Sequence, residues 1–437
     1  MHNTTRSRRN FDRNSHLLEF LQRELGKDFR ELRLRNGCTF ADTEYNVQRV
    51  GEELHRVAHE LIRILPQEDL WLCGNGAPSI RDQLWPESNR IDGLNPLTIC
   101  EAQWVDGPDG EFPATIEGLK AFFTWVKDDL VTRGCNGVET VAWRYDPFRL
   151  LDDDAYRDQI LEIHGLVPRV DVLSSHLIGQ CVTDPIRKTH QGILPPEVWG
   201  DGFPFGVNFR AGLLYMTMPV ASKRLGLNDV THGFCGGANL WQVAYDFVRS
   251  QEDVEAGLML LASYWFPIMR VYWHLRHVHA LEIHGTEAAW DGDSFQKTKS
   301  ALPQNEWGIG FDRSHFIWQG LDPVGQMKRF SQLLYHVHLK SVRFDLTGQT
   351  GIMRGLESLG TYGGGWQFHT IGEGHDWRRG PERIEEDLIA LNELGYHGNV
   401  SAENEQPRAA RKGRMTRAIE NIAGALYAPT TLNYLPA

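Results

Sequence analysis

The sequence contains five acidic and histidine side chains in an order that metal chemistry can explain, and four of them end short segments that resemble β-strands. Such side chains converge when the strands are parallel neighbours, because their carboxyl ends then lie at the same edge of the sheet. Carboxylate oxygens and imidazole nitrogens together bind borderline-hard divalent ions such as Mn²⁺, Co²⁺ or Mg²⁺. We therefore predict a metal-dependent enzyme. The residues are Glu282, Asp312, His315, His338 and Glu403.

The composition excludes several classes of protein. The chain has 437 residues, 41% of them hydrophobic, which is enough to bury a large core. Its net charge is −12 and its one basic cluster is Arg6-Ser7-Arg8-Arg9, so a surface that follows nucleic-acid phosphates is not expected. Six widely spaced cysteines without a CxxC pair are typical of free thiols in a reducing compartment.

The N-terminus contains one pattern that resembles an export signal. Ser7-Arg8-Arg9-Asn10-Phe11 is similar to a twin-arginine motif, but a polar and charged stretch follows it in place of an apolar segment. No apolar run approaches the roughly 20 residues of a membrane span. We therefore expect a soluble, cytoplasmic protein.

The first 95 residues form a helical extension in this interpretation. Apolar residues recur at helical spacing from Leu17 to Phe29 and again from Val47 to Ile64. Many Gly and Pro residues then interrupt the stretch from Pro66 to Pro96. The predicted division is an extension over 1–95 and a main domain over 96–437.

The main domain alternates strand and helix patterns, which favours a (β/α)₈ TIM barrel. A doubly wound open sheet is the alternative, and the lack of a GxGxxG motif after the first strand weakens it. The predicted strands are 97–103, 137–142, 169–176, 229–234, 280–284, 308–312, 335–340 and 399–403. The predicted helices are 115–133, 154–164, 210–226, 239–275, 323–333, 381–395 and 408–427, with a short one near 293–301.

Four segments together resemble the xylose-isomerase-like TIM-barrel superfamily, which includes sugar and sugar-phosphate isomerases and epimerases. The segments are 308–323, 335–341, 372–377 and 395–405, which contain GIGFDRSHFIWQGLDP, YHVHLKS, GEGHDW and GYHGNVSAENE. The resemblance covers roughly residues 97–427 and is stronger after residue 275. Relatives include the metal-binding subunits of C-glycoside deglycosidases. Ser341 replaces the acid that usually follows the family lysine.

The resemblance implies one bound divalent metal ion, with Mn²⁺ expected and Co²⁺, Mg²⁺ or Zn²⁺ as alternatives. The implied metal ligands are Glu282, Asp312, His338 and Glu403, and the implied catalytic residues are Glu282, Glu403, His176 and His315. The implied substrate-binding residues are Glu139, Trp241, Lys340, Arg343, Trp366 and His375. His336 is interpreted as a packed histidine, and His284, Glu287 and Glu405 as supports of the ligands.

The expected reaction is isomerisation or epimerisation of a sugar. One or two carboxylates would move a proton next to the carbonyl through a metal-stabilised enediolate. The alternative is a lyase that cleaves 3-keto-glycosides (C- or O-glycosides) by β-elimination at the same metal site. Aromatic residues in the long segments 181–206 and 342–380 could stack on an aglycone (Trp199, Phe203, Phe205, Tyr362, Trp366, Phe368).

A phosphorylated substrate, a nuclease activity and a purely structural role are each less favoured. The Gly-rich stretch 361–366 has no Lys or Arg, which favours a non-phosphorylated sugar. Endonuclease-IV-type nucleases share the fold but use a basic face, unlike this acidic chain. A barrel kept only for binding or assembly would lack ligands, and none of the four is missing. We expect a homo-oligomer, with a small partner subunit as an alternative.

Overall fold

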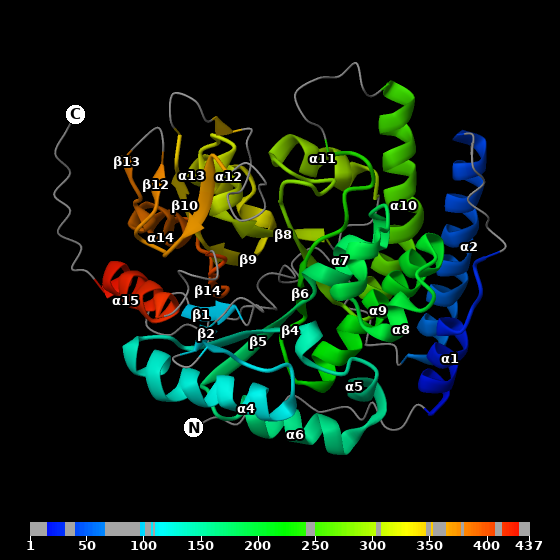
Figure 1. The fold of residues 1–437 in the computed structure, drawn as a ribbon, viewed down its shortest axis with the longest axis horizontal. Helices are drawn as coiled ribbons and strands as arrows, with labels where there is room; N and C mark the ends of the chain where they lie inside the picture. The colour runs from blue at the N-terminus through cyan, green and yellow to red at the C-terminus, as the bar shows by residue number, and fades with distance from the viewer. Residues whose placement is uncertain are drawn as a thin grey trace, which may run out of the picture.

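Eight parallel strands close into a barrel in the computed structural model (Figure 1). The structure describes residues 15–30, 40–65, 97–100, 106–107, 110–241, 250–302, 307–346, 351–352, 364–376, 380–406 and 413–427. The strand order around the barrel is β1-β14-β9-β8-β7-β6-β5-β4, and every pair is parallel. The strands are β1 (Leu97–Cys100), β4 (Gly137–Val141), β5 (Arg169–Ser174), β6 (Val230–Gly233), β7 (Val278–Glu282), β8 (Trp307–Asp312), β9 (Leu334–Leu339) and β14 (Val400–Ala402).

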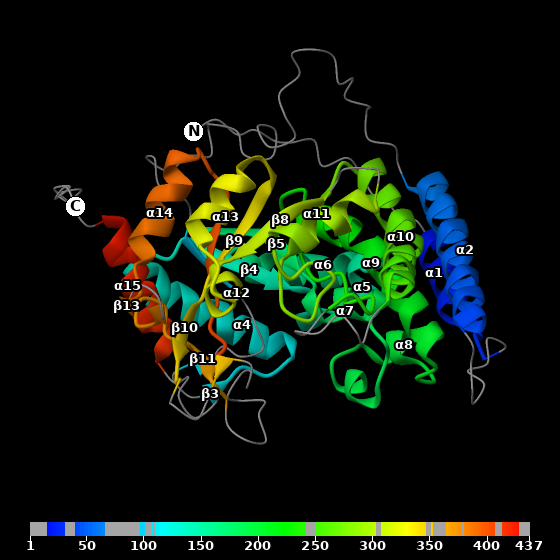
Figure 2. The same cartoon turned by 90° about the horizontal axis from the view of Figure 1, so that it is seen from above.

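The closed barrel confirms the predicted (β/α)₈ architecture, and the doubly wound alternative was wrong. Helices separate the strands along the chain and surround the barrel (Figures 1 and 2). The helices are α4 (Ile116–Trp125), α5 (Arg149–Asp152), α6 (Asp154–His164), α7 (His176–Thr183), α8 (Pro196–Trp199), α9 (Pro204–Arg224), α10 (Gln251–His274), α11 (Gly292–Ser300), α12 (Arg313–Trp318), α13 (Pro323–Arg329), α14 (Ile384–Glu393) and α15 (Arg414–Tyr427). In the part of the chain that the structure describes, no helix has both the length and the apolarity that a bilayer span requires.

Several predicted boundaries differ from the observed ones for local reasons. The helix predicted over 115–133 changes to a π-helical turn at 126–130 and ends at Gly134, whose φ of 103° favours glycine. Helix α9 begins earlier than predicted because Pro204 is suited to a first helical position. Helix α10 begins after Ser250, whose hydroxyl accepts from the Asp253 backbone N–H. Part of the predicted 239–275 helix, residues 242–249, lies outside the described residues.

The N-terminal part of the chain is helical, as α1 (Ser15–Leu25) and α2 (Phe40–Ile64). Figure 1 shows α2 beside α10, and α2 also contacts α9. At Gly51 an added Cβ would lie 3.1 Å from the Ser263 Cβ, so glycine allows α2 and α10 to approach closely. Buried residues of α1 and α2 belong to the same hydrophobic cluster as the barrel helices. The predicted boundary at residue 95 lies outside the described residues and stays a prediction.

A small antiparallel sheet follows β9 at the carboxyl end of the barrel. It consists of β10 (Ser341–Phe344) and β11 (Trp366–His369), and β10 begins two residues after the end of β9. The short pair β12 (His375–Asp376) and β13 (Gly380–Pro381) lies against β10. Glu382 stabilises this region, because its carboxylate accepts hydrogen bonds from the backbone N–H groups of Gly372 and Gly374, at 3.0 Å each. We call the region 341–382 the outer segment.

Glu382 also connects the outer segment to the barrel through an arginine. The Arg313 guanidinium, 5% exposed, contacts the carboxylates of both Glu382 and Asp387. Arg313 directly follows the last residue of β8, and Asp387 lies on α14. The outer segment, β8 and α14 are therefore joined by one buried group of charges.

Candidate metal centre

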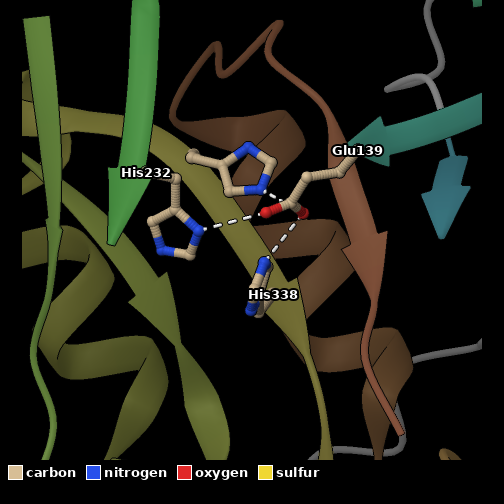
Figure 3. Close-up of side chains that lie close together, drawn as sticks. Glu139, His232 and His338 are labelled. Carbon is tan, nitrogen blue, oxygen red and sulfur yellow. Dashed lines mark hydrogen bonds and ion pairs between the residues drawn. The ribbon is translucent and has the colours of Figure 1, made fainter. Parts of the chain in front are cut away.

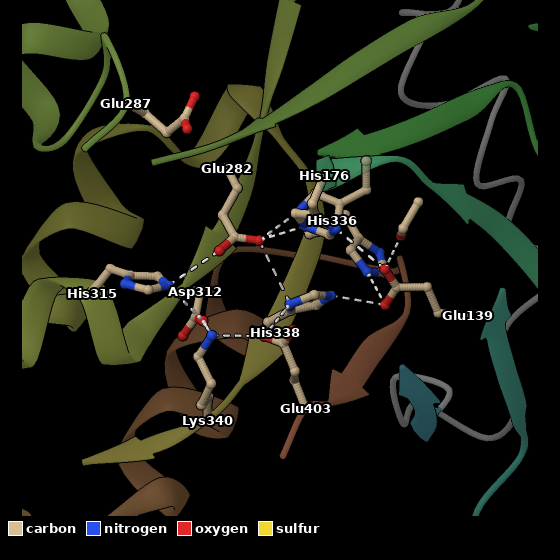
Figure 4. Close-up of polar contacts among 12 residues, drawn as sticks. Glu139, His176, Glu282, Glu287, Asp312, His315, His336, His338, Lys340 and Glu403 are labelled. Carbon is tan, nitrogen blue, oxygen red and sulfur yellow. Dashed lines mark hydrogen bonds and ion pairs between the residues drawn. The ribbon is translucent and has the colours of Figure 1, made fainter. Parts of the chain in front are cut away.

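The predicted ligands converge at the carboxyl ends of consecutive barrel strands (Figure 4). Glu282 is the last residue of β7, and Asp312, the last residue of β8, pairs in register with His338 of β9. Glu403 directly follows β14. The four side chains are nearly inaccessible, with exposures between 0% for Asp312 and 7% for Glu403.

The start of α12 fixes the orientation of Asp312. Its Oδ1 accepts from the Ser314 backbone N–H at 2.8 Å, as an N-cap residue does. Its Oδ2 lies 3.2 Å from His315 Nε2 and 2.8 Å from Lys340 Nζ. The DxxH spacing thus brings a carboxylate and an imidazole together, because the two residues share the first turn of one helix.

Glu282 is surrounded by imidazoles. Its Oε2 lies 2.9 Å from His176 Nε2 and 3.2 Å from His232 Nε2, and its Oε1 lies 3.1 Å from His315 Nε2. Burial acts to raise the pKa of Glu282, but His176 and the other imidazoles hold it well below its usual value. His176 is the first residue of α7 rather than the end of β5, so the predicted strand was two residues too long.

His338 presents one ring nitrogen to each side. Its Nε2 lies 2.8 Å from Glu139 Oε2, and its Nδ1 lies 3.1 Å from Glu403 Oε2. When the Nε2–H donates to Glu139, the Nδ1 lone pair faces the Glu403 carboxylate, so two acceptors oppose one another. A cation between them would resolve this arrangement, and a carboxylate behind a histidine is the usual orientation for a metal ligand.

Lys340 carries a buried positive charge among carboxylates. Its Nζ lies 2.8 Å from Asp312 Oδ2, 2.8 Å from Glu403 Oε2 and 2.7 Å from Glu405 Oε2, and the residue is 2% exposed. Burial would lower the pKa of Lys340, but Asp312 and the other carboxylates raise it well above its usual value. The ammonium group is therefore charged and offsets part of the negative charge.

The pKa values of two further residues, Glu403 and His315, lie far from their ordinary values. Burial acts to raise the pKa of Glu403, but Lys340 and His338 lower it to about 2. Burial acts to lower the pKa of His315, but the Asp312 charge raises it to about 9. The carboxylates are thus ionised at neutral pH.

This donor set fits a divalent ion. The ligand atoms of Asp312, His338 and Glu403 all lie within 4.8 Å of one another, and Glu282 Oε2 lies 3.7 Å from His338 Nδ1. Three carboxylates and one imidazole form an oxygen-rich set that suits Mn²⁺ or Mg²⁺. Glu282, Asp312 and Glu403 supply three carboxylates beside the single ammonium group of Lys340, so negative charge remains for a cation to neutralise.

Two predicted substrate-binding tryptophans belong to an aromatic wall beside this cluster. Trp366 stacks on Trp318 with ring centroids 5.0 Å apart, and the Trp318 Nε1–H donates to His315 Nδ1 at 3.3 Å. Trp241 packs edge-on against Trp290 at 5.5 Å. An added Cβ at Gly285 would lie 2.7 Å from Trp318 and 3.5 Å from Trp241, so this glycine lies between the two pairs. The aromatic wall consists of Trp241, Trp290, Trp318, Trp366 and Phe368, whose ring lies 4.5 Å from Lys340 Nζ.

Two other predicted substrate-binding residues lie apart from the cluster. Arg343, with a side chain 43% exposed, pairs with Asp345 at 3.1 Å. His375, on β12, lines a surface pocket together with Arg313 and Glu382. The structure therefore brings neither side chain into contact with the predicted ligands.

Glu139 lies deeper than a substrate-binding residue would. It is on β4 and 0% exposed, and its carboxylate contacts Ser174, His232, His336 and His338. Glu139 therefore lies within the barrel rather than at its mouth, and its predicted contact with the substrate stays a prediction.

The interpretation of His336 as a packed histidine missed its Nε2 contact with the Glu139 carboxylate at 2.7 Å. His232 was not predicted at all, because Thr231-His232-Gly233 matches no motif; its buried strand position was the available signal. Among the predicted supports, Glu405 contacts Lys340, and the His284 ring lies 4.1 Å from that of His315. The third, Glu287, instead accepts from the backbone N–H of Cys235 at 3.1 Å.

Comparisons with known sequences give one partial match and no family. No protein-family model matches it. The uncharacterized protein YfiH of Bacillus subtilis (strain 168) is 24% identical over 148 residues, which cover 33% of this chain and 45% of YfiH. The match thus spans less than half of that protein.

Solved structures with a similar fold include xylose isomerase domain proteins and sugar epimerases. The probable 3-DHS dehydratase AsbF of Bacillus anthracis gives a TM-score of 0.49 at 11% identity, covering 75% of this chain and 98% of AsbF. The IOLI protein with a bound zinc atom gives 0.48 at 13%, covering 76% and 99%. The xylose isomerase domain protein of Planctomyces limnophilus gives 0.47 at 14%, covering 76% and 97%. At this level of similarity no activity is transferred, and the barrel assignment rests on the chain's own strand order.

Proposed function

We propose that the chain is a divalent-metal-dependent isomerase or epimerase of a non-phosphorylated sugar. The observation that carries the proposal is the convergence of Glu282, Asp312, His338 and Glu403 around a buried excess of negative charge. Bound there, the ion would supply positive charge beside two adjacent substrate oxygens as negative charge develops on them.

Two ligand carboxylates would move the proton. Glu282 extends from β7 and Glu403 follows β14, so the two approach from separate parts of the barrel rim. One carboxylate that removes and returns the proton on a single face of the sugar gives isomerisation. Two that act on opposite faces give epimerisation.

Imidazoles beside Glu282 would handle the hydroxyl proton. His176 Nε2 and His315 Nε2 both lie within hydrogen-bonding distance of the Glu282 carboxylate, at 2.9 and 3.1 Å. Because His315 Nδ1 accepts from the Trp318 Nε1–H, its ring proton is on Nε2, the nitrogen that faces Glu282 and Asp312. It would therefore donate a hydrogen bond to the substrate oxygen that carries the developing charge.

The test is solvent exchange together with a product screen. The purified protein, loaded with Mn²⁺, is incubated with free aldoses and ketoses in D₂O. We expect deuterium at the carbon next to the carbonyl and a new isomer or epimer. Glu282→Gln and Glu403→Gln should each lower the rate at least ~100-fold, because a positioned acid–base group contributes about that much.

Glu373→Gln is the matched control, since Glu373 pairs with Arg417 at 3.0 Å, on the protein surface. Its rate should equal that of the wild type. If the wild type shows no exchange with any sugar at any supplied metal, the proposal fails.

A second candidate is the lyase that cleaves 3-keto-glycosides, and the aromatic wall favours it. A free sugar does not require an aromatic pair, whereas an aglycone ring could pack against Trp318, which is partly buried and backed by the buried Trp366. Of the other aromatic residues predicted for this role, Trp199, Phe203 and Phe205 pack against the hydrophobic core. Tyr362 lies outside the described residues. Release of an aglycone from a 3-keto-glycoside distinguishes the lyase from the isomerase.

A further inference from the structure

One interior layer of the barrel is polar where such barrels normally pack branched apolar side chains. Glu139 extends inward from β4, His232 from β6 and His338 from β9 (Figure 3), and His336 lies two residues before His338 on β9. All four residues are 0% exposed. Alternation along β9 explains why two histidines separated by one residue face the same interior. We call these four residues the deep cluster.

The histidines of the deep cluster all direct a nitrogen at one carboxylate. His336 Nε2 lies 2.7 Å and His338 Nε2 2.8 Å from Glu139 Oε2, and His232 Nδ1 lies 3.2 Å from Oε1. One donor atom from each of the four residues lies within 4.8 Å of the other three. The four donor atoms are therefore close enough together to surround a single ion, whose bonds to them would be about 2.0–2.2 Å long.

The backbone makes room for this arrangement. A Cβ added at Gly310 of β8 would lie 2.2 Å from both Cδ2 and Nε2 of the His232 ring. Only glycine at that strand position lets the imidazole occupy the interior. The deep cluster therefore depends on residues from four strands, which is more than a chance contact of two polar side chains requires.

Burying these groups without a cation is costly. The contacts of Glu139 in the described structure are Ser174 and the three imidazoles. A fully buried carboxylate needs a compensating charge, and buried imidazoles need partners for both nitrogens. His336 Nδ1 has no hydrogen-bond partner among the described residues.

We propose that the deep cluster binds a second divalent metal ion. Three imidazole nitrogens and one carboxylate oxygen form a nitrogen-rich set that suits Zn²⁺, with Co²⁺ as a substitute, in four-coordinate geometry. Because all four positions come from the protein and the cluster is inaccessible, the ion would be structural. The ion takes the place of the protons that otherwise join the imidazoles to Glu139.

The second ion differs chemically from the one proposed at the barrel mouth. The mouth set has three carboxylates and one imidazole, whereas the deep set has the reverse ratio. His338 belongs to both, with Nε2 toward Glu139 and Nδ1 toward Glu403, so with both ions bound it would release its ring proton to solvent and bridge them as an imidazolate. The deep site does not depend on the proposed reaction, because its other ligands are not among the catalytic residues.

The test is metal stoichiometry by mass spectrometry on the full chain after loading with Zn²⁺ and Mn²⁺ and dialysis. We expect two ions per wild-type chain. Glu139→Gln and His336→Gln should each lose one ion, and Asp312→Asn should lose the other. His164→Gln is the matched control, since His164 is a buried histidine whose Nε2 lies 2.9 Å from the Tyr145 hydroxyl, outside both sets; it should keep both ions.

Each outcome has one meaning. One ion per wild-type chain, lost in Asp312→Asn and kept in His336→Gln, overturns the deep site and leaves the deep cluster as a hydrogen-bonded support of His338. One ion lost in His336→Gln and kept in Asp312→Asn supports the deep site and removes the basis of the proposed function. If the deep-cluster variants do not fold, Asp312→Asn decides: an ion that remains bound in this variant supports the deep site, and its absence overturns it.

Discussion

Replacing Lys340 by methionine tests whether an ion shares the carboxylates that this lysine now neutralises. Methionine keeps most of the length of the side chain and removes the charge. Asp312, Glu403 and Glu405 would each lose an ammonium contact of 2.7–2.8 Å. In metal-free protein nothing replaces that charge.

The expected loss in the free energy of unfolding of Lys340→Met follows from the burial of Lys340. Lys340 is 2% exposed, so the three contacts are poorly screened by solvent. Removing one partner from a buried ion pair lowers the free energy of unfolding by about 3–5 kcal/mol. A bound ion at 100 times its dissociation constant raises it by about 2.7 kcal/mol. Because the ion is attracted by charges that Lys340 no longer offsets, we expect tighter metal binding in Lys340→Met.

The assay is urea unfolding of wild type and variant in EDTA and in Mn²⁺. The variant should lose about 3–5 kcal/mol in EDTA and recover more of it in Mn²⁺ than the wild type gains. Lys223→Met is the matched control, since Lys223 pairs with Asp229 at 2.7 Å, away from the cluster. Equal effects of Mn²⁺ on Lys340→Met and wild type would refute the reasoning.

Three further predictions use other parts of the molecule. Trp366→Ala removes the stacking partner of Trp318 and should raise KM for an aromatic glycoside by about two- to twelvefold with little change in kcat, because a stacked pair contributes about 0.5–1.5 kcal/mol. An unchanged KM would exclude the aromatic wall from substrate binding. Gly310→Ala crowds the His232 ring and should lower the free energy of unfolding by about 1–3 kcal/mol, measured in urea; a neutral effect would contradict the packing described. Burial lowers the pKa of His164 from its ordinary value of 6.5 to about 3. Between these two pH values the unfolded chain binds a proton at His164 that the folded chain does not, so the free energy of unfolding decreases as the pH falls through this range. Between pH 7.5 and pH 5 the wild type should lose about 2 kcal/mol more than His164→Gln; equal losses would show that this histidine is protonated in the folded state.

The sequence predicted the barrel well because strand and helix periodicity is local information. Observed strand ends such as Glu282 and Asp312 coincide with residues singled out from the sequence or lie close to them. The DxxH pair was also detectable, since both residues belong to one helical turn.

The deep cluster could not be predicted, because it depends on contacts across the barrel. Glu139 on β4 meets His336 on β9, 197 positions later in the chain. Nothing in the local pattern shows whether an inward carboxylate lies at the mouth or one layer below it. The same limit explains Arg343, which follows the lysine closely in sequence but projects from β10 toward Asp345.

The charge group at Arg313 has a consequence for engineering this protein. Exchanging loops at the carboxyl end of a barrel is a common way to change specificity while the scaffold is kept. Here the outer segment ends in Glu382, which contacts Arg313, and Arg313 adjoins the proposed ligand Asp312. A graft that replaces residues 341–382 without an acid at position 382 would leave the arginine with Asp387 alone and loosen the start of α12. A graft that changes specificity would then displace the proposed metal ligand, unless it retains that single carboxylate.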